Sequence, residues 1–195
     1  AADATYAHRT GDYLLFYENN YGREGLFINL QALALKAFGN TIPALKLWSI
    51  VFGTLTVWGM YLLGSELFRR RSAGLIAAFI TATSFWAINF SRIGFRAIMT
   101  SLLLSFSFYF LFRGLRTRRL ADFLWGGLIF GIGLHTYVAF RVAPLILVIL
   151  LPALILSYEN FLRRYWKHGL VFVFGAFVSA APMLYHFFIS HPQDF

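Results

Sequence analysis

The sequence predicts an all-α protein with about six transmembrane helices, and three observations lead to this fold class. Hydrophobic residues make up 59% of the chain and charged residues only 13%, whereas a water-soluble domain carries about a quarter charged residues. The apolar residues fall into runs close to the 20 that a helix needs to cross a bilayer. Lys and Arg are concentrated in alternate loops between these runs.

The composition also excludes several classes of protein. The chain has no cysteine, which rules out disulfides and thiolate metal sites. A formal charge of +9 is typical of nucleic-acid-binding proteins. Here most of that charge is confined to short loops between apolar runs, so we expect no nucleic-acid partner. The sequence contains no P-loop, no GxGxxG before a helix, no HExxH and no nucleophile elbow.

Residues 1–43 are expected to form an outer loop that carries an interfacial helix at 24–38. That helix is apolar but is interrupted by Asn29, Gln31 and Lys36. At about 1.5 Å per residue it is too short to cross a hydrocarbon core about 30 Å thick. The chain begins without Met or a signal peptide and ends just past an apolar run. We therefore expect a piece of a longer membrane protein, with residues 190–195 starting another outer loop.

A transmembrane bundle is predicted over residues 44–189. Ten of the 17 Lys and Arg residues lie in three alternate loops, which the positive-inside rule places in the cytoplasm. The N-terminal segment, the turns at 91–95 and 139–141, and the C-terminal tail then share the outer face. Gly127 and Gly131 form a GxxxG step, which favours close helix packing over a dimer interface. The predicted spans are 44–67, 73–90, 96–113, 121–138, 142–158 and 169–189.

Two arginines at the outer edge are candidates for binding phosphate. Arg92 and Arg96 are four residues apart and share a helical face if the third span begins by residue 92. Paired guanidinium groups suit phosphate oxygens, which they bind through two parallel hydrogen bonds. The alternative is that both side chains reach toward lipid headgroups.

The next outer turn adds His135, Tyr137 and Arg141. His135 suits a sugar or phosphate contact or acid–base chemistry, but an interhelical hydrogen bond is the stronger interpretation. Tyr137 is also typical of the aromatic belt at a membrane surface, and Arg141 is a further candidate for phosphate binding.

The N-terminal segment supplies carboxylates that suit a general base for an acceptor hydroxyl or amine. Spacing does not choose among them, and a solvated loop explains each. Glu24 would favour the positive N-terminus of the short helix, and Arg23 beside it would reach a phosphate at the surface. The candidate charged residues of this segment are Asp3, Asp12, Glu18, Arg23 and Glu24.

Several stretches, in order and spacing, resemble bacterial membrane glycosyltransferases of the GT-C type. The superfamily that the chain resembles includes the protein O-mannosyltransferases and the lipid A aminoarabinose transferase, and its members are similar to glycosyltransferase family 39. The resemblance covers essentially the whole chain. The stretches that carry it are Glu18–Phe27, Ala44–Ser49, Gly53–Thr56, Phe90–Ala97, Tyr137–Arg141 and His191–Phe195.

The resemblance implies a sugar transferase with its site on the outer face of a bacterial plasma membrane. The donor would be a polyprenyl-phosphate sugar, and the anomeric carbon would invert with an acidic residue as base. Family members carry that base in an Asp-Glu pair after the first transmembrane helix. Asp3 is followed by Ala4 instead, so we expect the base upstream of this piece, with Asp3 or Glu24 as substitutes. Arg23, Arg92, Arg96 and Arg141 would hold the phosphate.

The sequence leaves other functions open. A transporter or flippase for a lipid-linked or anionic solute would show inverted repeats with broken helices near the midplane, and the sequence indicates neither. The hypothesis that the chain is a non-enzymatic membrane assembly subunit rests only on the GxxxG step. The sugar, the acceptor (protein, lipid or glycan) and the oligomeric state are undetermined. No ligand spacing argues for a divalent metal or any other cofactor.

Overall fold

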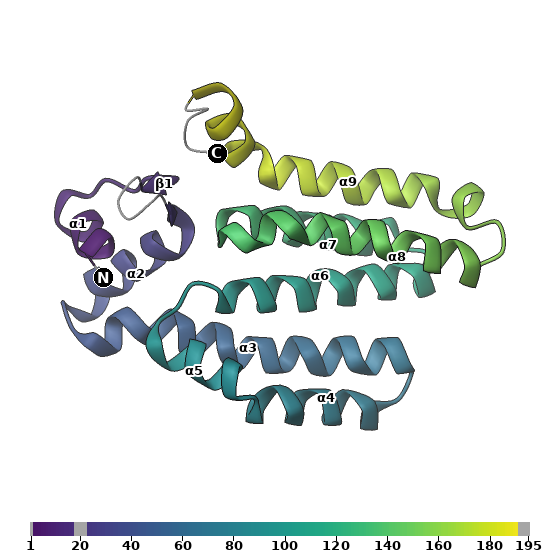
Figure 1. Ribbon diagram of the computed structural model, residues 1–195, viewed down its shortest axis with the longest axis horizontal. Helices are drawn as coiled ribbons and strands as arrows, with labels where there is room; N and C mark the ends of the chain where they lie inside the picture. The colour runs from purple at the N-terminus through teal and green to yellow at the C-terminus, as the bar shows by residue number, and fades with distance from the viewer. Residues whose placement is uncertain (1, 18–22, 191–195) are drawn as a thin grey trace.

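The computed structural model describes residues 2–17 and 23–190, and the long helices lie side by side in one bundle (Figure 1). Most of the described residues are helical, which confirms the all-α fold class. The long helices are α3 (Ile42–Phe68), α6 (Ile98–Thr117), α8 (Ala143–Ser157) and α9 (Phe161–Tyr185), with the shorter α4 (Arg71–Thr83), α5 (Phe85–Ile93) and α7 (Leu120–Ile132) among them.

Four segments in the described range are long and apolar enough to cross a membrane, or five if the bent pair α4–α5 is one span. α7 is apolar but is shorter, because it passes into a 3₁₀ turn, η1 (Gly133–His135). The predicted count of six spans is therefore not confirmed. Polytopic membrane architecture is supported by the apolar side chains that several of these helices expose, such as Ile149 and Leu156 on α8.

Local sequence explains where the main helices begin and break. At the start of α3, the Thr41 side chain accepts a hydrogen bond from the backbone N–H of Ala44, and Pro43 lies in the first turn. The predicted span 73–90 is bent by 55° between α4 and α5. Ser84 there adopts an extended conformation and interrupts the helical hydrogen bonds.

Small residues allow a close helix contact between α7 and α9. A methyl group added at Gly127 or Gly131 would overlap the backbone carbonyls of Phe172 and Ala176. The GxxxG step thus serves packing within the chain, as predicted. The adjoining core is aromatic and aliphatic and includes Phe123, Phe130, Phe140, Tyr165 and Phe172.

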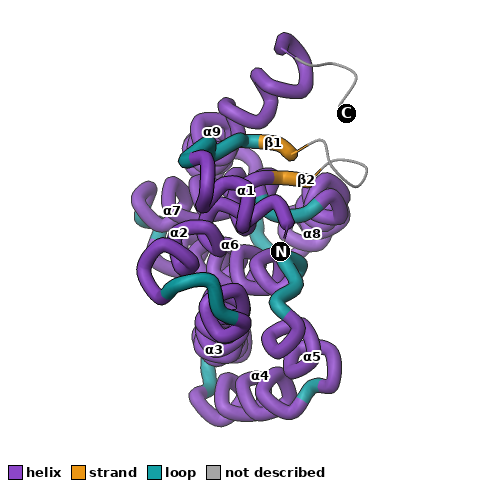
Figure 2. The backbone as a smooth tube through the Cα atoms, turned by 90° about the vertical axis from the view of Figure 1, so that its left-hand side faces the viewer, coloured by secondary structure: helices purple, strands orange, loops and turns teal. Residues whose placement is uncertain are grey.

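One end of the bundle carries a small cap built from the N-terminal segment (Figure 2). Residues predicted as loop form α1 (Ala2–Thr10) and a short antiparallel ladder of β1 (Phe16–Tyr17) with β2 (Arg23–Glu24). The predicted helix at 24–38 is present as α2 (Gly25–Phe38). The alanines Ala4 and Ala7 of α1 pack against Ala32 and Leu35 of α2. The first turns of α3 join this cluster, which fixes the cap on the bundle.

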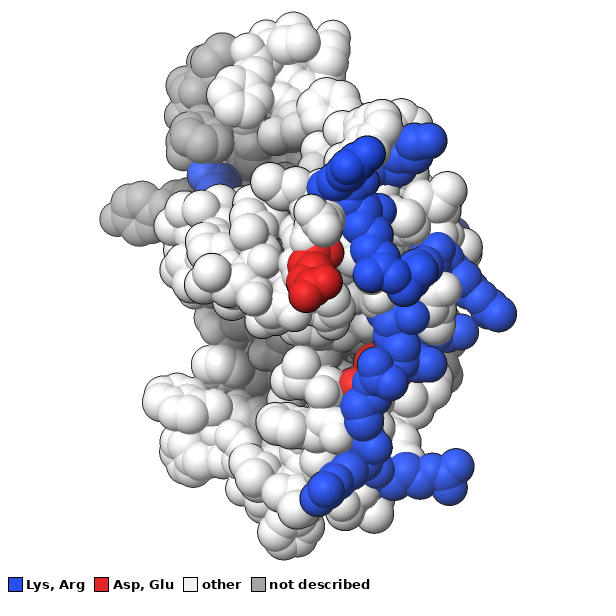
Figure 3. Space-filling view, turned by 90° about the vertical axis from the view of Figure 1, so that its right-hand side faces the viewer, with Lys and Arg blue, Asp and Glu red and all other residues white. Residues whose placement is uncertain are grey.

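The opposite end is strongly basic (Figure 3). It is formed by the loops α3–α4, α6–α7 and α8–α9, the three that the sequence singled out. Arg116 pairs there with Glu66 through two hydrogen bonds. Charge therefore divides the bundle into a basic end and a capped end. The assignment of the capped end to the outer side of the membrane stays a prediction.

Candidate functional site

Three segments that are distant in sequence meet at the capped end around one buried carboxylate. Glu24 of β2 is 2% exposed. Its Oε2 accepts a hydrogen bond of 2.9 Å from Nη1 of Arg96, which lies in the α5–α6 turn. Its Oε1 lies 3.7 Å from Nη2 of Arg141, in the α7–α8 connection. Glu24 therefore joins the cap to both turns.

Aromatic rings hold the two arginines from their other sides. The guanidinium of Arg96 lies 5.3 Å from the ring centre of Tyr137, and that of Arg141 lies 4.6 Å from the ring centre of Phe187. Phe187 belongs to η3 (His186–Ser190), a π-helical turn that continues α9. Such turns are frequent at functional sites. Cation–π contacts orient both cations without neutralising them.

Two glycines explain why these segments adopt the observed geometry. Gly25 follows Glu24, and a side chain there would overlap the carbonyl of Leu14. The close approach fixes the loop beside Glu24, since Gly25 N–H also donates to the Leu15 carbonyl at 2.7 Å. Gly133 makes the same kind of contact with the ring of the fully buried Phe140. That contact shapes the connection between α7 and α8 that carries Tyr137.

A cavity of about 420 Å³ lies beside this cluster. Its charged wall consists of Asp3 from α1, Arg23 from β2 and Arg96. Asp3 is 5% exposed, and its carboxylate lies 4.0 Å from the Arg23 guanidinium. The other lining residues are Ala4, Phe27, Ile28, Gln31, Gly94, Phe95 and Tyr137.

The electrostatics of the cavity centre on Arg96. Burial lowers the pKa of Arg96 from its ordinary value; Glu24 opposes this effect and the Arg23 charge adds to it. An arginine nevertheless stays protonated at neutral pH. The site therefore offers two guanidinium cations and a carboxylate in a partly dehydrated space, where each charge interacts more strongly than in water.

Arg92 lies apart from this cluster. α5 ends at Ile93, Gly94 takes a left-handed conformation with φ of 78°, and α6 begins only at Ile98. The helical face expected for Arg92 and Arg96 is therefore wrong, because Gly94 ends one helix between them. Arg92 is exposed on α5 and does not line the cavity.

His135 is used in packing. Its Nε2 donates to the backbone carbonyl of Ser179 on α9 at 2.9 Å, which is the interhelical bond that the sequence favoured. It does not line the cavity. Asp12 is exposed in the loop after α1. Glu18 lies outside the described residues, as do residues 18–22 of one stretch that carried the resemblance and the whole of another, residues 191–195.

Sequence reasoning missed two contributors to the site. Gln31 was noted only as a polar break in an apolar helix, yet it is 7% exposed and its Nε2 donates to the Leu45 carbonyl at 2.8 Å. An amide side chain within an otherwise apolar helix was the available signal. Phe187 gave no signal, since one more aromatic in an apolar run is unremarkable. Within the described residues, no three His, Asp or Glu side chains converge as a metal site would require.

Comparison with known proteins identifies the family. A sequence profile of the dolichyl-phosphate-mannose-protein mannosyltransferase family matches residues 26–186, which is most of the chain. Searches of curated proteins and of solved structures return no match. The matched segment contains Arg96, Tyr137 and Arg141, whereas Asp3, Arg23 and Glu24 precede it. The chain therefore belongs to the dolichyl-phosphate-mannose-protein mannosyltransferase family, membrane glycosyltransferases that use polyprenyl-phosphate sugar donors.

Proposed function

We propose that this chain takes part in sugar transfer from a polyprenyl-phosphate donor to an acceptor at the outer face of the membrane. The observation that carries the proposal is the convergence of Asp3, Arg23 and Arg96 on one cavity at the capped end of the bundle. A cavity at the membrane edge suits a donor whose chain stays in lipid while its phosphate and sugar reach water.

The two arginines suit the leaving group. In the transfer, the acceptor oxygen or nitrogen forms a bond to the anomeric carbon. The bond between that carbon and the phosphate oxygen breaks, and polyprenyl phosphate leaves with the electron pair. Arg23 and Arg96 would stabilise the charge that develops on the phosphate. The acceptor's proton passes to a carboxylate.

Asp3 fits the role of that carboxylate better than Glu24 does. Asp3 lines the cavity, whereas Glu24 does not. Each oxygen of Glu24 faces a guanidinium, Arg96 on one side and Arg141 on the other. Because a base must lie within hydrogen-bond reach of the proton it takes, we assign Glu24 the positioning of both arginines and Asp3 the proton transfer.

The direct test measures transfer in proteoliposomes from labelled polyprenyl-phosphate mannose, with a polyprenyl-phosphate pentose in parallel. Asp3→Asn should lower the transfer rate by about 100-fold or more, the usual contribution of a general base. Arg9→Ala is the matched control, because Arg9 is exposed at the end of the same helix. Transfer by Asp3→Asn at the control's rate would remove Asp3 from the mechanism.

The transporter hypothesis gains one observation, since the bent pair α4–α5 is the kind of broken helix that was not expected from sequence. The break does not resemble a solute site, however. The Ser84 N–H donates to the Thr81 carbonyl at 3.3 Å, and no charged residue lines the adjoining cavity. A transport site would place ion or substrate contacts there. Sugar transfer therefore remains the better supported function.

A further inference from the structure

A cavity of about 320 Å³ lies at the basic end of the bundle, where the last turns of α3, α6 and α8 come together (Figure 3). Its charged wall consists of Glu66 and Arg69 at the end of α3 and Arg116 at the end of α6. We name this space the basic-end cavity. The candidate site around Glu24 lies at the other end of the bundle, so the two sites share no residue.

One of the two arginines of the basic-end cavity is held in a fixed orientation. Arg116 donates from Nε to Oε1 of Glu66 and from Nη2 to Oε2, the second bond at 2.9 Å. The Glu66 side chain is only 11% exposed, and a carboxylate that accepts two parallel bonds fixes the plane of a guanidinium. A guanidinium has five N–H groups, of which this pair uses two. Arg116 therefore retains N–H groups for a further acceptor.

The second arginine brings a charge that no acidic side chain neutralises. Among the described residues, no carboxylate lies within 4.0 Å of Arg69. Arg69 ends α3 in a left-handed conformation with φ of 57°, a position that usually belongs to glycine. The chain thus keeps a cation at the rim of the cavity although glycine would suit the backbone better.

The charges of the basic-end cavity match those of one phosphodiester. Arg69 and Arg116 contribute two positive charges and Glu66 contributes one negative charge, which leaves one net positive charge. A phosphodiester carries one negative charge, and its oxygens suit guanidinium donors. A zwitterionic headgroup has no net charge and would leave the charge of the cavity uncompensated.

The rest of the wall is mostly apolar. Leu67 and Phe112 line the cavity from α3 and α6, and Leu150 and Leu154 line it from α8. A soluble phosphate compound would gain nothing from these side chains, whereas a hydrocarbon chain would bury surface against them. Cations at one end and aliphatic side chains beside them therefore indicate a lipid with an anionic head.

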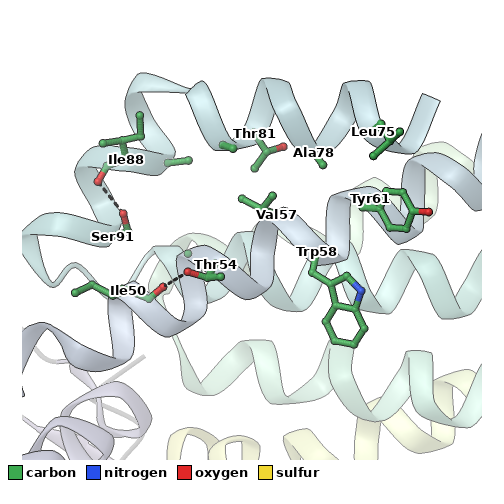
Figure 4. Close-up of a pocket in the computed structure, with 13 residues that line it drawn as sticks. Ile50, Thr54, Val57, Trp58, Tyr61, Leu75, Ala78, Thr81, Ile88 and Ser91 are labelled. Atoms are coloured by element: carbon green, nitrogen blue, oxygen red, sulfur yellow. Dashed lines mark hydrogen bonds between the residues drawn. The ribbon is translucent and has the colours of Figure 1, made fainter. Parts of the chain in front are cut away.

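The cavity between α3 and the bent pair α4–α5 provides a contrast (Figure 4). It is larger, at about 750 Å³, and Val57 and Thr81 face one another across it. No charged residue lines it, and the Thr81 hydroxyl is already bonded to the Ala77 carbonyl at 2.8 Å. An apolar wall alone does not identify an occupant, whereas the basic-end cavity combines such a wall with a defined charge.

We infer that the basic-end cavity binds the headgroup of an anionic glycerophospholipid. The phosphate lies against Arg69 and Arg116, and an acyl chain runs along Leu150 and Leu154 toward the bilayer. Glu66 positions Arg116 for this contact. The lipid then joins the ends of α3, α6 and α8. The inference goes beyond sugar transfer and does not depend on it.

The test is native mass spectrometry of the full chain in detergent micelles. The protein is titrated with phosphatidylglycerol and, separately, with phosphatidylethanolamine that carries the same acyl chains. We expect phosphatidylglycerol to bind at least about tenfold more tightly, since a hydrogen bond to a charged group contributes about this factor. Glycerophosphoglycerol, the same headgroup without acyl chains, should not displace it at equal concentration. Equal affinity of the two lipids, or displacement by the soluble headgroup, would overturn the inference.

A matched pair of variants tests the charge. Arg69→Gly removes the cation at the rim, whereas Arg118→Gly removes one from the α6–α7 loop outside the cavity. Both residues have a φ of 57°, which glycine adopts readily, so neither change should disturb the fold. Arg69→Gly should weaken phosphatidylglycerol binding about tenfold, and Arg118→Gly less than about twofold. Equal weakening would indicate diffuse attraction to the basic end and would contradict the site.

A second pair of variants tests the cavity while leaving every charge in place. Ala153→Trp fills the cavity from α8, whereas Ile155→Trp places the same ring on that helix at an exposed position outside it. Displacing the acyl chain by one methylene group or more should weaken binding at least about fourfold. Equal binding by the two variants would reject the cavity as the lipid site.

Discussion

Replacing Glu24 by Ala tests the idea that one buried carboxylate holds the capped end of the bundle together. The side chain is 3% exposed and faces Arg96 at 2.9 Å and Arg141 at 3.7 Å. Its loss would leave two cations without their carboxylate, and breaking a buried pair in this way costs about 3–5 kcal/mol. The Arg96 and Arg141 side chains are 15% and 24% exposed. Water therefore offsets part of the cost, and we expect about 2–3 kcal/mol.

The assay is reversible unfolding in mixed micelles, with Glu159→Ala as the control. Glu159 is exposed in the α8–α9 loop, so its replacement should change the free energy of unfolding by about 0.5 kcal/mol or less. Glu24→Gln keeps the size of the side chain and removes the charge. The double variant that combines Glu24→Gln with Arg96→Met, compared with the two single variants, then gives the coupling free energy between Glu24 and Arg96. We expect this energy to be about 1–3 kcal/mol. A coupling near zero, or equal stability of the two Ala variants, would refute the reasoning.

Two further substitutions probe packing and the cavity. Gly131→Leu should destabilise the bundle by about 1–3 kcal/mol, because the larger side chain overpacks the contact with α9. The same unfolding assay measures this loss. Gly169→Ala is the control, since open space surrounds Gly169. Tyr137→Leu should weaken binding of undecaprenyl phosphate about threefold, because a cation–π contact with Arg96 contributes about 0.5–1 kcal/mol. Tyr137→Phe keeps the ring and should bind as the parent does; equal weakening of both variants would show that the hydroxyl matters instead.

The predictions that held depend on local pattern. The helix at 24–38 and the packing role of Gly127 and Gly131 each follow from residues close together in the chain. Hydrophobic runs and small-residue steps report the environment of a helix directly.

The predictions that failed depend on backbone geometry at single residues. Ser84 breaks a span that is continuous in hydropathy, because the hydropathy of a segment does not depend on the backbone conformation of one residue. Gly94 separates Arg92 from Arg96 for a related reason: its left-handed conformation ends α5, whereas residue spacing alone assumes an unbroken helix. The folding of residues 2–10 as α1 was missed because the packing of its alanines on α2 stabilises a polar segment.

By itself the sequence determined that this is a helical membrane protein with one basic end, since hydropathy and loop charge are sums over neighbouring residues. Only the tertiary structure decided which charged groups meet. Glu24 and Arg96 are 72 residues apart, and Arg141 is further still along the chain. Their pairing arises from how α6 and α7 place two turns under the cap. A contact between residues so far apart in the chain depends on the packing of whole helices. The spacing of neighbouring residues therefore does not predict it.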